Sequence, residues 1–139
     1  MDYFGRTLVN DPGSPWDFKR WVPDVVVLNL GLNDFSTEPR PRPEDFIAGD
    51  LAMLKRVRAA YPDAWLVSYN ASGWPDYVPF VHQAVAEFSR AGDARALSYE
   101  FGGELTQASA CDYHPTVQQD RKLGEDLAAK LAPLWKAPG

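Results

Sequence analysis

The chain has 139 residues, of which 45% are hydrophobic, so it is long enough to bury one core and too short for two. We therefore predict a single domain over residues 1–139. Fourteen basic and nineteen acidic side chains give a net charge of −5, and these charges are scattered rather than blocked. This distribution argues against nucleic acid and anionic membranes as partners. A single cysteine excludes an intrachain disulfide framework, and no apolar run is long enough for a membrane helix.

The predicted elements alternate between strands and helices. A short helix is predicted at 16–21, and Pro23 ends it before a first strand at 25–30. The apolar run that opens this strand does not alternate with polar residues, which indicates a strand covered on both faces. The remaining predicted elements are a helix at 44–60, a strand at 64–69, a helix at 78–91, a strand at 94–99 and a closing amphipathic helix at 117–134.

The order β-α-β-α-β-α with short loops is typical of a three-layer α/β/α fold with a doubly wound parallel sheet. In such sheets ligands bind at the carboxyl ends of the strands. The segment 31–36, the loop at 70–75 and the segment that ends at His114 would all emerge there. We therefore expect the two polar motifs of the chain to meet at this edge.

The first motif is Gly31-Leu-Asn33-Asp34, directly after the first strand. The Asn33 amide can donate a hydrogen bond to an oxyanion, and Gly31 lets the backbone turn tightly without a clashing side chain. The alternative interpretation is an ordinary turn or helix cap after a strand.

The second motif is Cys111-Asp-Tyr-His-Pro115, before the closing helix. His114 is the natural general base, because a histidine exchanges protons near neutral pH. Asp112 could hold the imidazole in the productive tautomer and stabilise its charged form. The alternative is that His114 only caps the last helix. Cys111 is interpreted as a small core residue rather than a nucleophile.

Together the two motifs resemble blocks of the SGNH (GDSL) hydrolases, and the match is closest to carbohydrate esterase family 2. The lead-in Trp16-Asp-Phe18 and Trp21-Val-Pro-Asp24 is similar to that family as well. The resemblance implies an SGNH, flavodoxin-like sheet and a serine nucleophile that removes acetyl groups from plant polysaccharides, with no metal or other cofactor. It implies that such proteins are usually secreted, although this chain shows no signal peptide and its localisation stays open.

By the same resemblance, Asn33 would be the oxyanion donor with Gly31 shaping its loop, His114 the base and Asp112 its partner. The chain departs from the superfamily in two places. Asp112 and His114 are only two positions apart, so a backbone carbonyl is the alternative partner of the imidazole. The chain also contains no Gly-Asp-Ser element, so we expect it to be the C-terminal part of a catalytic domain, truncated at its N-terminus.

Three serines are the candidates for a replacement nucleophile, in the order Ser36, Ser109 and Ser72. None of them is predicted on the tight strand-to-helix elbow that usually exposes a nucleophilic serine. Two alternatives are that His114 activates water directly, or that a partner subunit contributes the nucleophile.

The predicted partner is a small acyl ester or an acetylated saccharide, with Asp34, Trp74 and Tyr113 lining its site; loop packing explains Trp74 equally well. The missing family strand would leave 25–30 as a hydrophobic sheet edge, and such edges recruit another chain. We therefore expect a homodimer or higher oligomer through this edge. The competing functional class is a non-catalytic domain that binds a carbohydrate or a protein.

Overall fold

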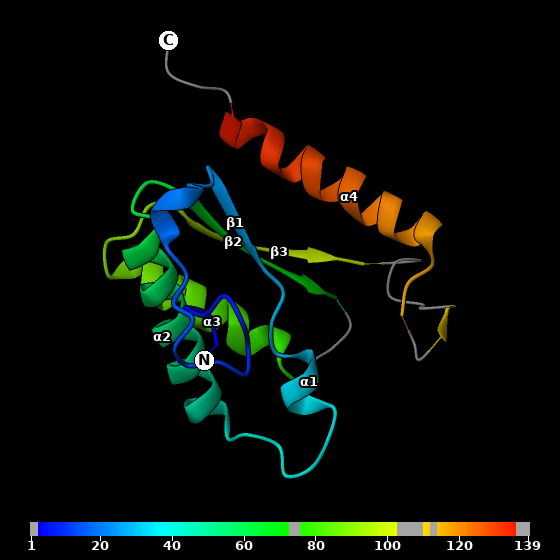
Figure 1. Cartoon of the computed structure of the whole chain (residues 1–139). Coiled ribbons are helices and arrows are strands. Elements are labelled where there is room, and N and C mark those ends of the chain that lie inside the picture. Colours follow the sequence, from blue (N-terminus) through cyan, green and yellow to red (C-terminus); the bar gives the residue numbers. More distant parts are fainter. Residues whose placement is uncertain (1–2, 73–75, 103–109, 112–113, 136–139) are drawn as a thin grey trace.

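The structure is a computed structural model that describes residues 3–72, 76–102, 110–111 and 114–135. Within these residues β1 (Val25–Leu28), β2 (Trp65–Ala71) and β3 (Ala96–Phe101) form a parallel sheet in the order β1-β2-β3. Two helices, α2 (Pro43–Ala60) and α3 (Val78–Arg90), cover one face, and α4 (Val117–Leu131) crosses the other (Figure 1). This layering confirms the predicted three-layer α/β/α fold with a parallel sheet.

The helices α2 and α3 contribute most of the core. Pro43 is the first residue of α2. The acidic side chains in the first turn stabilise the helix because they lie at the positive end of its dipole. On the inner face of α2, Leu54 and Val57 are fully buried, and α3 buries Val81 and Val85 in the same layer. These positions recur at the spacing of one helical face, which is why both helices were predictable from the sequence.

The three strands differ in how well they are covered. The central strand β2 pairs on both sides, and its Leu66 and Val67 have no exposed surface. The strand β1 pairs only with β2 among the described strands, and Val27 is 41% exposed. The expectation that the first strand is covered on both faces is therefore wrong at Val27, because the described contacts of α4 fall on β2 and β3.

The helix α4 is attached to the sheet through polar groups. The Tyr69 hydroxyl donates to the Asp126 carboxylate over 2.7 Å, and the Lys130 ammonium lies over the Tyr99 ring. Thr116 caps the helix, with reciprocal hydrogen bonds between it and Gln119. No residue of α4 is fully buried. Among the described residues no helix is long and apolar enough to cross a membrane.

At the amino ends of β2 and β3, Arg58 connects several parts of the chain. Its guanidinium donates two hydrogen bonds to the Asp93 carboxylate, at 2.6 and 3.0 Å. It also donates to backbone carbonyls, including those of Ala64 and Arg95. The end of α2 and the starts of β2 and β3 are therefore held together by one side chain.

Several predicted boundaries need correction. The predicted helix at 16–21 is a single 3-10 turn, Phe18–Arg20. The third strand begins at Ala96 rather than at residue 94, because the Asp93 carboxylate accepts from the Arg95 amide and forms a turn there. The first strand ends at Leu28, and the closing helix ends at Leu131 before a 3-10 turn, η4 (Ala132–Trp135).

Candidate functional site

The candidate site lies at the carboxyl edge of the sheet. The short helix α1 (Leu32–Phe35) follows the end of β1, and α4 begins at the side of the molecule where β2 and β3 end (Figure 1). His114 lies three residues before α4. The parallel arrangement thus directs both sequence motifs toward the same end of the sheet.

Gly31 holds the turn between β1 and α1 in a conformation that other residues rarely adopt. Its φ is +112°, and its carbonyl accepts from the amides of Asp34 and Phe35. A Cβ atom at this position would lie 2.6 Å from the Tyr77 ring and 2.9 Å from the Phe46 ring. Glycine is therefore required both by the backbone angle and by the surrounding aromatic side chains.

Phe35 anchors α1 in the core. It is 8% exposed, and its ring centroid lies 5.1 Å from that of Phe46 and 5.9 Å from that of Phe80. This contact leaves Asn33 exposed on the outer side of the turn. The sequence interpretation of the Asn33-Asp34 segment as a loop is corrected to one helical turn, which the buried aromatic ring stabilises.

His114 is exposed, and backbone hydrogen bonds fix its main chain. Its amide donates to the Cys111 carbonyl and its carbonyl accepts from the Ala110 amide, both over 3.0 Å. Within the described residues no hydrogen bond or ion pair joins the His114 ring to another side chain. Cys111 is exposed, so the prediction of a core cysteine is wrong.

The structure describes some of the predicted site residues and not others. Gly31, Asn33, Asp34 and Ser36 share one turn, in which the Ser36 hydroxyl donates to the Asn33 carbonyl over 3.0 Å. Ser72 follows β2, and its hydroxyl lies next to Gly102, which follows β3. The predicted site residues that lie outside the described part of the chain are Trp74, Ser109, Asp112 and Tyr113.

Among the described residues, no group of three or more His, Cys, Asp or Glu side chains is arranged to hold a metal ion. The carboxyl edge instead contains a buried amide. Asn70, on β2, is 2% exposed, and within the described part of the chain its side-chain oxygen and nitrogen both lack a hydrogen-bond partner.

No protein-family model matches the chain. It is 31% identical over 137 residues to the cellulase/esterase CelE of Acetivibrio thermocellus, and 25% identical over 133 residues to an acetylxylan esterase / glucomannan deacetylase of Cellvibrio japonicus. A solved family two carbohydrate esterase from Clostridium thermocellum, in complex with cellohexaose, superposes with a TM-score of 0.85 at 30% identity. The homologues and structural neighbours of this chain are family 2 carbohydrate esterases.

The match extends along nearly all of this chain but only part of each esterase. It covers 94% of the chain and 17% of CelE, and 88% of the chain and 36% of the acetylxylan esterase. For the solved family two esterase the shares are 96% of this chain and 42% of that chain. The comparison confirms the SGNH-type fold that the sequence predicted.

Within this esterase-like fold, a second group of side chains was missed by sequence reasoning. The Ser98 hydroxyl on β3 lies 2.8 Å from Nδ1 of His82 on α3, and Nε2 of the same ring lies 2.6 Å from the Glu100 carboxylate. Serine, histidine and carboxylate thus follow one another in a hydrogen-bonded series. The alternation Ser98-x-Glu100, which puts both side chains on one face of a strand, was the available signal.

Proposed function

We propose that the chain carries a carbohydrate esterase site of the family 2 type, which removes acetyl or other short acyl groups from a saccharide. The homologues support the reaction class. The observation that supports the proposal is the turn at Gly31, after which the exposed Asn33 follows closely on the end of β1. His114 precedes a capped helix that starts at the same side (Figure 1).

In the proposed reaction a hydroxyl nucleophile attacks the acyl carbon and transfers its proton to the His114 imidazole. The Asn33 amide donates to the oxygen that becomes negatively charged. Collapse of the tetrahedral intermediate expels the sugar oxygen, which takes the proton from His114. Water then hydrolyses the acyl group from the nucleophile by the same steps. Asp112, or a backbone carbonyl, orients the imidazole.

The nucleophile is proposed among Ser36, Ser109 and Ser72, with water or a hydroxyl from a second chain as alternatives. Ser36 is closest in sequence to Asn33, but its hydroxyl must leave the Asn33 carbonyl before it can react. The chain contains no Gly-Asp-Ser element, and the family that it resembles takes its other oxyanion donors from that element and the block after it. Loss of one oxyanion donor typically lowers the rate by a factor of about 10² to 10³. We therefore expect slow turnover from this chain alone.

Hydrolysis of p-nitrophenyl acetate by the wild type and the His114→Ala variant tests this proposal, with free imidazole as the reference for unassisted catalysis. Loss of turnover in His114→Ala supports the site. Turnover that persists in His114→Ala but disappears in both Ser98→Ala and His82→Ala would assign the hydrolysis to the Ser98 series instead. Alanine variants of Ser36, Ser72 and Ser109 then identify the nucleophile.

The alternative is a domain that binds carbohydrate without hydrolysing it. A solved relative is described in complex with cellohexaose, which makes a cello-oligosaccharide the appropriate probe. Saturable binding of cellohexaose together with imidazole-like ester hydrolysis in the wild type and in His114→Ala would favour this function over the esterase.

We also propose that the chain self-associates through β1. The Trp65 amide donates to the Asp24 carbonyl, and because direction alternates along a strand, the Val25 and Val27 amides point to the open edge. Sedimentation of the wild type should show a dimer or larger species. A Val27→Lys variant should shift it toward monomer, because charged side chains discourage edge pairing. A wild type that stays monomeric at micromolar concentration would contradict this proposal.

A further inference from the structure

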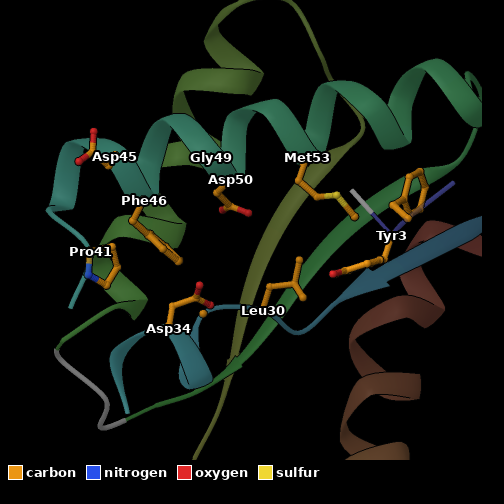
Figure 2. A pocket seen from close by; sticks show the side chains of 11 residues that line it. Tyr3, Leu30, Asp34, Pro41, Asp45, Phe46, Gly49, Asp50 and Met53 are labelled. Carbon is orange, nitrogen blue, oxygen red and sulfur yellow. The ribbon is translucent and has the colours of Figure 1, made fainter. Parts of the chain in front are cut away.

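A cavity of about 620 Å³ lies between α2 and the connection from β1 to α1. We call it the α2 cavity. Its walls include Tyr3, Leu30, Phe46, Asp50 and Met53 (Figure 2). This volume falls within the range of small-molecule sites in proteins. Gly31 and Asp34, which belong to the proposed esterase site, also line this cavity, whereas Asn33 and His114 do not. Substitution of Asp50 therefore changes the cavity while it leaves the proposed oxyanion donor and general base in place.

Asp50 is the polar group inside the α2 cavity. The residue is 8% exposed, and its Oδ2 has no hydrogen-bond partner among the residues that the structure describes. Figure 2 shows its carboxyl group directed from α2 into the cavity, on the side of Leu30 and Asp34. Burial raises the pKa of Asp50 to about 6, so most of it carries a charge at neutral pH. A buried charge without a partner is costly, so an occupant that donates to Oδ2 would be strongly favoured.

The other walls restrict the chemistry of the occupant. A second carboxyl group, from Asp34, is directed into the cavity from α1 (Figure 2). Asp45, also on the wall, is already neutralised by two hydrogen bonds from Arg42, at 2.7 and 2.9 Å. Two carboxyl groups disfavour an anion, and an uncharged apolar molecule would leave Asp50 without a donor. Phe46, Leu30 and Met53 provide apolar surface, and aromatic faces attract cations.

We propose that the α2 cavity binds an organic cation, an ammonium or guanidinium group on an apolar stem, whose N–H groups donate to Asp50. The apolar stem packs against Phe46, Leu30 and Met53. Two sources supply this chemistry: a free amine, or a lysine or arginine side chain of a second copy of the chain. The chain's net charge of −5 favours the approach of a free amine cation.

Benzylamine is the probe, and benzyl alcohol, which has the same shape without the charge, is the ligand control. Binding is followed by NMR through the backbone amides of Gly31 and Gly49, which line the cavity. We expect saturable shifts with benzylamine in the wild type and an affinity about tenfold or more lower in Asp50→Asn. Benzyl alcohol should bind both proteins equally weakly. Asp63→Asn, at a side chain that is 97% exposed, should bind benzylamine like the wild type.

Absence of saturable benzylamine binding, or an unchanged affinity in Asp50→Asn, overturns the proposal. If Asp50→Asn does not fold, Leu30→Trp replaces it: Leu30 is 46% exposed, so a larger side chain can narrow the cavity without disturbing the core. Benzylamine affinity should then fall, and an unchanged affinity overturns the proposal. Sedimentation with and without benzylamine separates the two sources. A dimer that benzylamine dissociates assigns the cation to a second copy, and a species that it does not change assigns it to a free amine.

Discussion

The Asp50→Asn substitution should stabilise the protein at neutral pH, because it removes a charge from a buried side chain. Burial raises the pKa of Asp50 from 3.8 to about 6. Between these values the folded chain keeps a proton that the unfolded chain has lost, so stability falls as pH rises. Above the folded-state pKa, the full free-energy cost of burying the ionised Asp50 carboxylate is present. A shift of roughly two units corresponds to about 3 kcal/mol in the free energy of unfolding. Asparagine has nearly the same shape and avoids this cost.

Urea unfolding, followed by tryptophan fluorescence from about pH 4 to pH 8, measures the effect. The free-energy difference between Asp50→Asn and the wild type should grow by at most about 1.4 kcal/mol per pH unit and level off above pH 6. Asp63→Asn is the matched control, because its side chain is 97% exposed, and its difference should stay flat. Parallel profiles for Asp50→Asn and the wild type would refute the assignment of the cost to the buried carboxyl group.

Three further substitutions have defined outcomes. Gly31→Ala should lower the free energy of unfolding by about 2–4 kcal/mol, since it adds a Cβ at φ +112° within 3 Å of two rings; an unchanged urea midpoint would contradict the required geometry. Arg58→Ala should cost about 3–5 kcal/mol, while Arg42→Ala, in an exposed pair, should cost much less; equal losses would count against the buried network. Tyr69→Phe should cost about 1–2 kcal/mol in thermal unfolding by removing the hydrogen bond to Asp126, and no loss would mean that this bond is unimportant.

The long helices were predictable because their apolar residues repeat on one face over three or more turns. The shorter elements were harder to predict from the sequence. The start of β3 depends on Asp93, which is held by Arg58 from 35 residues earlier in the chain. The turn α1 depends on the burial of Phe35 against Phe80. Interactions between distant residues decide both cases, and local patterns do not contain them.

The candidate sites also divide into those that local sequence patterns predict and those that depend on contacts between distant residues. The two sequence motifs predicted the carboxyl edge, since parallel strands end there whatever their loops do. The series Ser98–His82–Glu100 required the packing of α3 on β3. The sequence spacing does predict that Asp50 is buried, because it lies four residues after Phe46 and four before Leu54, on the buried face of α2. A carboxyl group at such a position is a signal even without a structure.

The weak burial of α4 affects how long His114 stays in place at the proposed site. It contains no fully buried residue, whereas α2 and α3 both do, so separating it from the sheet exposes little apolar surface. Such a helix opens by local unfolding at a lower free energy than the rest of the domain. Its amides should exchange with deuterium earlier than those of β2. Because His114 lies only three residues before α4, each opening would release the proposed general base. The fraction of time that α4 is docked would then set an upper limit on the proportion of molecules ready to react.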